Sequence, residues 1–291
     1  MLTESRNPRS THIDQLTTLE MLHIMNDEDA TVATTVRQAL PQIARAVDAI
    51  VTALRDGGRL IYVGAGTSGR IGVLDASECV PTFGTPPELV RGLIAGGPDA
   101  LTTSIEGAED DADAGRADLL ALALAPSDAV VGIAASGRTP YVIGALEAAN
   151  EIGALTIAIA CNSPAPILER AQIAIAAPVG PEVITGSTRL KAGTAQKLIV
   201  NMLSTASMIR MGKVYQNLMV DVQITNQKLA RRTRGIVVEV TGCNEEQAQE
   251  WLVACHNEVK TAIVVGLLGI SPDDARQRLH EHQGMLRPVI E

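Results

Sequence analysis

The stretch Ile61-Tyr62-Val63-Gly64-Ala65-Gly66-Thr67-Ser68-Gly69 decides the fold, because a short apolar run passes directly into a glycine-rich turn. Four further short apolar runs follow, and segments with helical periodicity separate them. Strands that alternate with helices in this way are typical of a parallel sheet covered by helices. We therefore predict an α/β fold, with a five-stranded parallel sheet sandwiched by helices and with strands at 59–63, 90–95, 129–134, 154–160 and 172–176.

Helical patterns lie on both sides of this region. Apolar residues recur at helical spacing from Gln15 to Arg55, and residues 187–212 have the pattern of a long closing helix. Three short helical patterns follow residue 240, whereas the first twelve residues have the character of a loose polar arm. The predicted organisation is an N-terminal helical segment (1–50), a sheet domain (51–235) and a small helical domain (236–291).

Composition narrows the classes of partner. The 291 residues carry a formal charge of −9, which argues against nucleic acid or an anionic membrane as partner, because both require a basic surface. No apolar run approaches the ~18 residues of a membrane span. The polar start MLTESRNPRS does not resemble a secretory signal, and four scattered cysteines fit a reducing compartment. We expect a cytoplasmic protein.

The turn GAGTSG satisfies the dinucleotide pattern G-x-G-x-x-G, but its surroundings do not. A nicotinamide site also needs an acidic residue at the end of the second strand, which here ends in Ala95-Gly96-Gly97. Glu88 lies before that strand, and no Walker lysine follows the turn. Backbone N–H groups and two hydroxyls at a helix start instead suit a phosphate monoester.

A second turn of the same kind follows the strand at 129–134, with the sequence Ala135-Ser136-Gly137-Arg138-Thr139-Pro140. Parallel strands end at one edge of a sheet, where open α/β folds bind ligands. Either turn alone could be a tight connection whose hydroxyl caps a helix. Together they predict a phosphate site, with candidate ligands Gly66, Thr67, Ser68, Ser136, Arg138 and Thr139.

Both turns resemble those of sugar isomerase (SIS) domains, which bind phosphosugars. Residues 180–197, GPEVITGSTRLKAGTAQK, resemble a signature shared by glucokinase regulatory protein and the bacterial N-acetylmuramic acid 6-phosphate etherases. The chain is similar to the etherases over nearly its whole length, for example at NDED (26–29), DASEC (75–79), EGAED (106–110) and NLMVD (217–221).

The resemblance implies an SIS fold, with a C-terminal bundle like a ubiquitin-associated domain. It also implies a lyase that cleaves the D-lactyl ether of N-acetylmuramic acid 6-phosphate by elimination and hydration, without a cofactor. The products are N-acetylglucosamine 6-phosphate and D-lactate, in cell-wall recycling. Glucokinase regulatory protein carries two SIS domains, but this chain has room for one, so we expect a homodimer.

The same resemblance places catalytic carboxylates at Glu78, the acid that protonates departing lactate, and at Glu109, its partner base. From the residues alone, Glu109 belongs to an acidic run that is typical of a solvated loop. We also predict substrate contacts from Ser187 and Lys191, where the alternative is simple capping of the long helix. The histidines stand apart and predict no metal site.

Two other classes of function remain. A non-catalytic phosphosugar-binding regulator would share the long signature, and an aldose–ketose phosphate isomerase would use similar turns with a proton-transferring carboxylate. Release of lactate separates the etherase from both of them.

Overall fold

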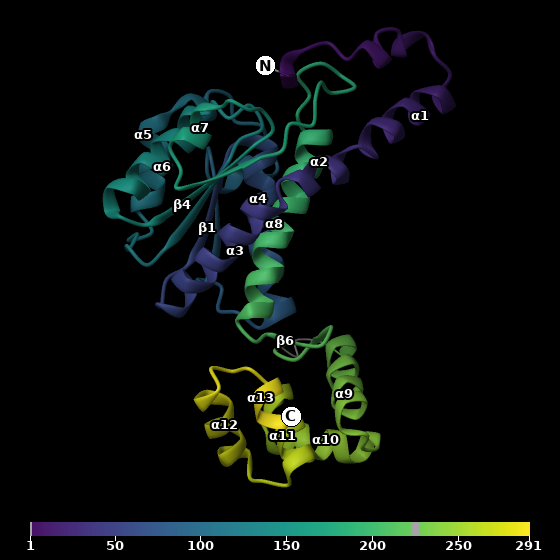
Figure 1. The fold of residues 1–291 in the computed structure, drawn as a ribbon, viewed down its shortest axis with the longest axis vertical. Coiled ribbons are helices and arrows are strands. Elements are labelled where there is room, and N and C mark those ends of the chain that lie inside the picture. The colour runs from purple at the N-terminus through teal and green to yellow at the C-terminus, as the bar shows by residue number, and fades with distance from the viewer. Residues whose placement is uncertain (1, 223–226) are drawn as a thin grey trace. The chain divides into compact units, whose positions relative to one another are not determined.

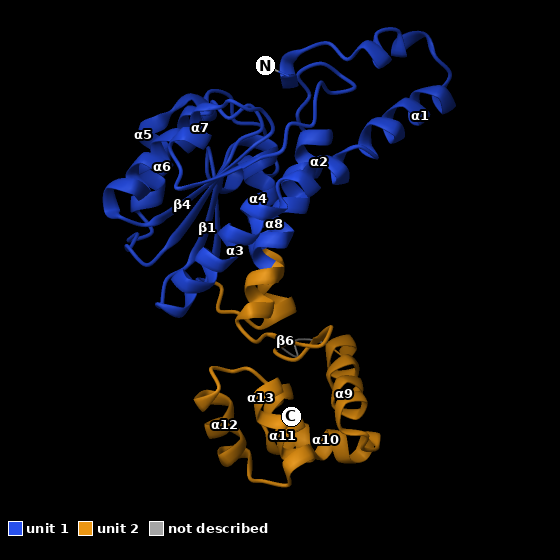
Figure 2. Ribbon diagram, in the orientation of Figure 1, with its two compact units in different colours: residues 1–76, 88–204 blue, residues 77–87, 205–291 orange. Residues whose placement is uncertain are grey.

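The computed structural model describes residues 2–222 and 227–291, so Met1 of the predicted N-terminal segment and residues 223–226 of the predicted sheet domain lie outside it. The chain forms two compact units (Figure 2). Unit 1 comprises residues 1–76 and 88–204, and unit 2 comprises residues 77–87 and 205–291.

Unit 1 is built on the predicted sheet of five parallel strands (Figure 1). The strands lie in the order β2-β1-β3-β4-β5 and begin and end within a few residues of the predicted bounds. They are β1 (Leu60–Gly64), β2 (Val90–Ile94), β3 (Ala129–Ile133), β4 (Leu155–Ala160) and β5 (Ile173–Ala176). β1 lies between β2 and β3 and pairs in register with both, so that Leu60 faces Val90 on one side and Ala129 on the other. Its five residues are all buried, which explains why its sequence is apolar without alternation.

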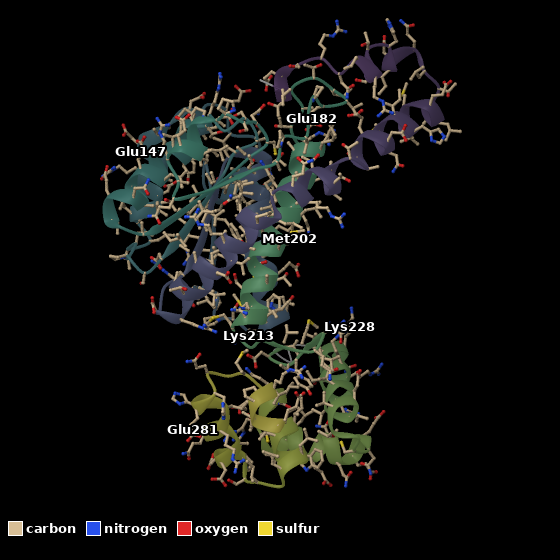
Figure 3. The ribbon with its side chains drawn as sticks, in the orientation of Figure 1. Glu147, Glu182, Met202, Lys213, Lys228 and Glu281 are labelled. Carbon is tan, nitrogen blue, oxygen red and sulfur yellow. The ribbon has the colours of Figure 1, made fainter. Side chains whose placement is uncertain are left out.

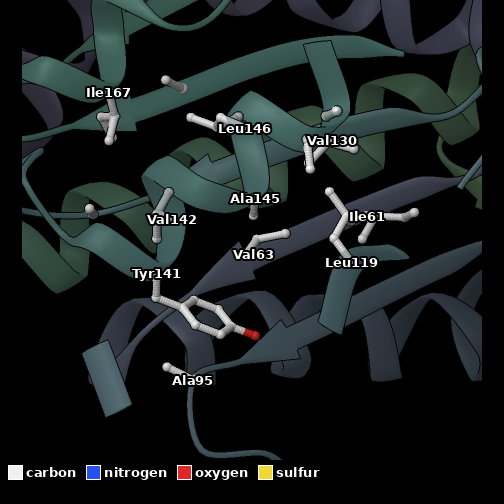
Figure 4. Packing of buried hydrophobic residues seen from close by; sticks show 14 of the residues in the cluster. Ile61, Val63, Ala95, Leu119, Val130, Tyr141, Val142, Ala145, Leu146 and Ile167 are labelled. Atoms are coloured by element: carbon white, nitrogen blue, oxygen red, sulfur yellow. The ribbon is translucent and has the colours of Figure 1, made fainter. Parts of the chain in front are cut away.

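Helices cover both faces of the sheet. On one face, side chains of β1, β3 and β4 pack against α6, with Ile61, Val63 and Val130 meeting Val142 and Leu146 (Figure 4). α5 packs closely on α6, since a Cβ on Gly144 would lie 2.0 Å from the carbonyl oxygen of Ala112. The other face carries α3, α4 and α8. The bounds are α3 (Leu40–Arg55), α4 (Gly66–Phe83), α5 (Ala112–Leu120), α6 (Pro140–Ile152), α7 (Pro166–Glu169) and α8 (Lys191–Arg210).

The N-terminal residues are fixed by buried polar contacts, which corrects the expectation of a loose arm. Thr3, Asn7 and Ser10 are buried, and the Ser10 hydroxyl donates to the carbonyl oxygen of Val183 at 2.7 Å. Thr3 donates its backbone N–H to the side chain of Asn162. Two helices, α1 (Thr18–Asp29) and α2 (Val32–Gln38), lead from this segment to α3, as the helical periodicity predicted.

Unit 2 contains a two-stranded hairpin and the C-terminal helices. The hairpin pairs β6 (Val214–Tyr215) with β7 (Leu218–Met219), and the helices share one apolar core. They are α9 (Gln227–Thr241), α10 (Glu245–Ala254), α11 (Val259–Leu268), α12 (Pro272–Glu281) and α13 (Arg287–Ile290). Within the described residues no single helix is long and apolar enough to cross a bilayer, and α10 with α11 passes that test only as a pair bent by 116°.

The units divide the chain at other places than the predicted domains. The predicted boundary at 50/51 falls inside α3, whose buried residues pack on the sheet. The boundary at 235/236 falls inside α9, which belongs entirely to unit 2. Apolar side chains pack across both positions, so the contacts do not separate there.

Candidate active site

The carboxyl edge of the sheet has a switch point beside β1. The chain leaves β1 for β2 on one side and then crosses to β3 on the other, so the turns after β1 and β3 leave neighbouring strands in divergent directions. Ligands of open α/β sheets bind in the crevice at such a point. The two turns predicted to bind phosphate are these two.

The first turn needs its glycines because the backbone passes very close to its surroundings. A Cβ on Gly64 would lie 2.6 Å from the backbone nitrogen of Gly69, and Gly66 has a φ of 52°. α4 begins at Gly66, so its first N–H groups open at the sheet edge. Thr67 is half-buried, whereas Ser68 is buried and donates its hydroxyl to Gln196 Oε1 of α8 at 3.0 Å. The Ser68 side chain is therefore held by the protein itself.

The second turn is compact as well. Gly137 has a φ of 72°, and its backbone passes so near to Ala165 that a Cβ would lie 2.4 Å from that side chain. Ser136 accepts a hydrogen bond from the backbone N–H of Arg138 at 3.2 Å, and Arg138 itself is exposed. Thr139 precedes α6 without a capping hydrogen bond from its side chain. This turn offers a cation and a hydroxyl that is not used as a cap.

Glu109 lines a pocket of about 290 Å³ at the carboxyl ends of β1 and β2. The carboxylate is exposed, on a short 3-10 turn (Ala108–Asp110) after β2. Gly66 lines the same pocket, so the structure brings the first predicted turn together with this candidate base. The remaining lining residues are Ala65, Arg70, Ala95, Ala100, Ser104, Ile105, Glu106, Gly107 and Ala108. Sequence reasoning missed Arg70, although it directly follows GAGTSG.

Glu78 does not line this pocket. It is exposed on α4, twelve residues after Gly66, which corresponds to about 18 Å along the axis at 1.5 Å per residue. One turn earlier on α4, Asp75 accepts hydrogen bonds from the Tyr62 hydroxyl at 2.8 Å and the Ser204 hydroxyl at 3.1 Å. Burial raises the pKa of Asp75, although these two bonds and Lys197 oppose the shift. This buried network ties α4 to β1 and α8.

Lys191 has a different environment from the one predicted. α8 begins at Lys191 itself, so Ser187, which is half-buried, lies in the turn before the helix. The Lys191 side chain is 2% exposed, and its Nζ lies 2.5 Å from Glu28 Oε2 of α1. In this structure its ammonium therefore holds the N-terminal segment through Glu28, and the substrate contact stays a prediction.

Glu182 occupies the N-terminus of α8 (Figure 3). Its fully buried carboxylate accepts the backbone N–H groups of Lys191 at 3.0 Å and Ala192 at 2.9 Å. The anion that this helix start favours is thus a side chain of the protein. Within residues 2–222 and 227–291, no three His, Cys, Asp or Glu side chains are grouped so that they could hold a metal ion.

Comparison with known proteins places the chain in a family. It is 58% identical over 290 residues to the N-acetylmuramic acid 6-phosphate etherase of Photorhabdus laumondii, which covers 100% of this chain and 96% of the relative. It is 57% identical to the protein of the same name from Vibrio vulnificus strain YJ016, covering 100% and 97%. The chain belongs to the N-acetylmuramic acid 6-phosphate etherase family.

Domain and fold comparisons agree with membership in the etherase family. Residues 42–150 match the N-terminal SIS domain of glucokinase regulatory protein, residues 111–206 the SIS domain, and residues 216–260 the C-terminal lid domain of glucokinase regulatory protein. A phosphoheptose isomerase from Francisella tularensis has the same fold, with a TM-score of 0.54 at 21% identity, over 67% of this chain and 100% of that one. A putative phosphosugar isomerase from Bacteroides fragilis has a TM-score of 0.53 at 21% identity, over 69% and 95%.

Proposed function

We propose that this chain cleaves the D-lactyl ether of N-acetylmuramic acid 6-phosphate, giving N-acetylglucosamine 6-phosphate and D-lactate. The observation that carries the proposal is the pocket at the switch-point edge, which joins Glu109 to the start of α4. Family membership over the whole chain supplies the substrate. The reaction would serve the recycling of cell-wall amino sugars.

The phosphate is assigned to the two turns at the sheet edge. The first N–H groups of α4 and the Thr67 hydroxyl come from one side, and Arg138 and the Thr139 hydroxyl come from the other. A helix start combines free N–H donors with a positive dipole end, which favours an anion. Ser68 and Ser136 shape the turns through the hydrogen bonds that they already make.

The chemistry needs one base and one acid. In the open-chain sugar the C2 proton lies alpha to the aldehyde, and the lactyl oxygen leaves from C3. Glu109 removes the C2 proton, Glu78 protonates the departing lactate oxygen, and a double bond forms between C2 and C3. Water then adds its oxygen to C3 and a proton returns to C2, with the two carboxyl groups in reversed roles. Each atom is accounted for without a redox step.

We further propose a homodimer in which Glu78 and Glu109 of one site come from different copies. The support is the length of α4, because Glu78 lies about 18 Å along the axis from the helix start that lines the Glu109 pocket. We also propose a cytoplasmic location. Cys79, Cys161 and Cys255 are buried and no cysteine is in a disulfide, as in reducing compartments.

The activity is tested by turnover of N-acetylmuramic acid 6-phosphate in water labelled with heavy oxygen. We expect unlabelled lactate and label at C3 of the sugar, because the bond between C3 and the ether oxygen breaks. The variants Glu109→Gln and Glu78→Gln should each lose at least about 100-fold in kcat. Binding of the phosphosugar without any lactate would instead indicate a phosphosugar-binding regulator.

The shared site is tested by mixing. Glu78→Gln and Glu109→Gln chains, each inactive alone, are unfolded and refolded together. If the carboxylates come from different copies, the mixed dimers contain one intact site, and random pairing restores about a quarter of wild-type activity. If both carboxylates come from one chain, the mixture stays inactive and the proposed sharing is wrong.

A further inference from the structure

The pocket around Glu109 contains one positively charged lining residue, Arg70. It lies on α4, one turn after Gly66, and its side chain is half-buried. Glu106 and Glu109 contribute negative charge to the same lining. Arg70 and the two carboxylates thus line one pocket, where a direct ion pair of Arg70 with Glu109 would weaken the proposed base.

The contacts of Arg70 leave its charge unpaired. Nε donates to the carbonyl oxygen of Leu101 at 3.0 Å, and Nη2 donates to that of Thr103 at 3.4 Å. Both acceptors are neutral, and among the described residues the ion pairs within 4.0 Å do not include Arg70. A guanidinium has five N–H donors in a planar fork that matches a carboxylate. The two backbone bonds therefore orient the group without neutralising it.

The substrate of the proposed function, on which this inference rests, carries two anions. One is the phosphate on C6, and the other is the carboxylate of the lactyl group attached to C3. Glu109 acts at C2, the carbon next to C3, whereas C6 is four carbon–carbon bonds away from C2. The anion that must lie nearest to Glu109 is thus the lactyl carboxylate.

We propose that Arg70 binds the lactyl carboxylate and thereby selects ethers that carry an acid group. Its place in the Glu109 pocket, its neutral backbone partners and its planar fork fit this ligand. With the lactyl carboxylate bound to it, the guanidinium would also lie close to the ether oxygen on which negative charge develops as lactate departs. Hydrogen bonds to the carboxylate would hold that oxygen in line for elimination.

The test compares two substrates on two proteins. The substrates are N-acetylmuramic acid 6-phosphate and 3-O-ethyl-N-acetylglucosamine 6-phosphate, which differ in the carboxylate but share the phosphate and the ether. Arg70→Gln removes the charge and keeps an amide that can donate to the Leu101 carbonyl. In Arg70→Gln we expect kcat/KM for the lactyl ether to fall about 10- to 100-fold, the loss typical of a hydrogen bond to a charged group. We expect kcat/KM for the ethyl ether to stay the same. An equal fall on both substrates would mean that Arg70 holds the 101–109 loop or binds phosphate, and the proposal would be wrong.

A binding measurement separates this proposal from the proposed function. The C1-reduced alditols of the two sugars have no aldehyde and cannot undergo elimination, so their affinities report binding alone. Wild type should prefer the lactyl alditol, and Arg70→Gln should lose that preference, whether or not lactate is released in turnover. Equal affinities in wild type would overturn the assignment. Arg116→Gln is the matched control: this exposed arginine pairs with Glu151 on the outer helices, and its loss should change neither ratio.

Discussion

The ion pair between Lys191 and Glu28 gives the sharpest test of how the N-terminal segment is held. Its nitrogen and oxygen lie 2.5 Å apart, and the side chains are 2% and 9% exposed. At an effective dielectric constant near 20, a pair at this distance attracts by roughly 7 kcal/mol, which is similar to the cost of desolvating the two ions. The net contribution of the intact pair is therefore small. Removing one partner alone leaves a buried charge and costs about 3–5 kcal/mol.

We expect Lys191→Met to lose about 3 kcal/mol of unfolding free energy in urea, the lower end of that range, because Arg9 still donates to Glu28 at 3.1 Å. Glu28→Leu should lose a similar amount. The double variant should be much closer to wild type than the sum of the two, because no charge is left unpaired. Additive losses would refute the buried pair. A raised KM in Lys191→Met with unchanged stability would instead restore the predicted substrate contact.

The pair also sets a pH dependence. Burial raises the pKa of Glu28, but Lys191, Asn7 and Arg9 outweigh it, so the pKa lies below its usual value of 4.5. A lowered pKa contributes stability above about pH 4.5 that is lost as the pH falls through the folded-state value. Lys191→Met should therefore show a shallower acid loss of stability than wild type. A wild-type slope in the variant would contradict this cause.

Two further predictions concern stability. Burial raises the pKa of Asp128, but hydrogen bonds from Arg59 and the Ala125 backbone lower it overall. Asp128→Asn should therefore cost about 3 kcal/mol of unfolding free energy at pH 7 in urea, and less at pH 3, because the stability from a lowered pKa is lost as the pH falls. An equal cost at both pH values would exclude the ionic contribution. Gly144→Ala should lower stability by about 3 kcal/mol, because its Cβ would lie 2.0 Å from a backbone oxygen of α5, whereas Gly153→Ala, with open space but a φ of 87°, should cost about 1 kcal/mol. Equal melting temperatures for the two glycine variants would show that α5 and α6 separate readily.

The sheet was predictable from the sequence because its information is local. The strands are short apolar runs, fully buried in β1 and β3, and the turns after these two strands carry glycines that the backbone geometry requires. The connection from α11 to α12 is specified locally as well: Gly269 ends α11 in a left-handed conformation, and the Ser271 side chain accepts from the backbone N–H of Asp274 at the start of α12. Such signals lie within a few residues of the structure that they specify.

The contacts that the sequence did not reveal have the opposite property. Lys191 finds Glu28 at a separation of 163 positions, and Ser10 finds the carbonyl oxygen of Val183 at 173. Helical periodicity does not encode these pairings, so the burial of Lys191 could not be foreseen, and the first residues were wrongly predicted to form a loose arm. Arg70 was missed for a related reason, since its role depends on a loop that begins about thirty positions later. The assignments of Glu78 and Glu109 came from the resemblance and remain predictions.

The discontinuity of unit 2 has a consequence for the newborn chain. Residues 77–87 leave the ribosome early, but most of the unit to which they belong, residues 205–291, follows only after residues 88–204. At roughly 5–20 residues per second, the early segment waits about 6 to 23 s for its partners. During that interval Cys79 and Phe83, which are buried in the finished protein, lack the later part of their unit. The end of α4 is thus a segment to which a cotranslational chaperone would bind until the rest of unit 2 has been made.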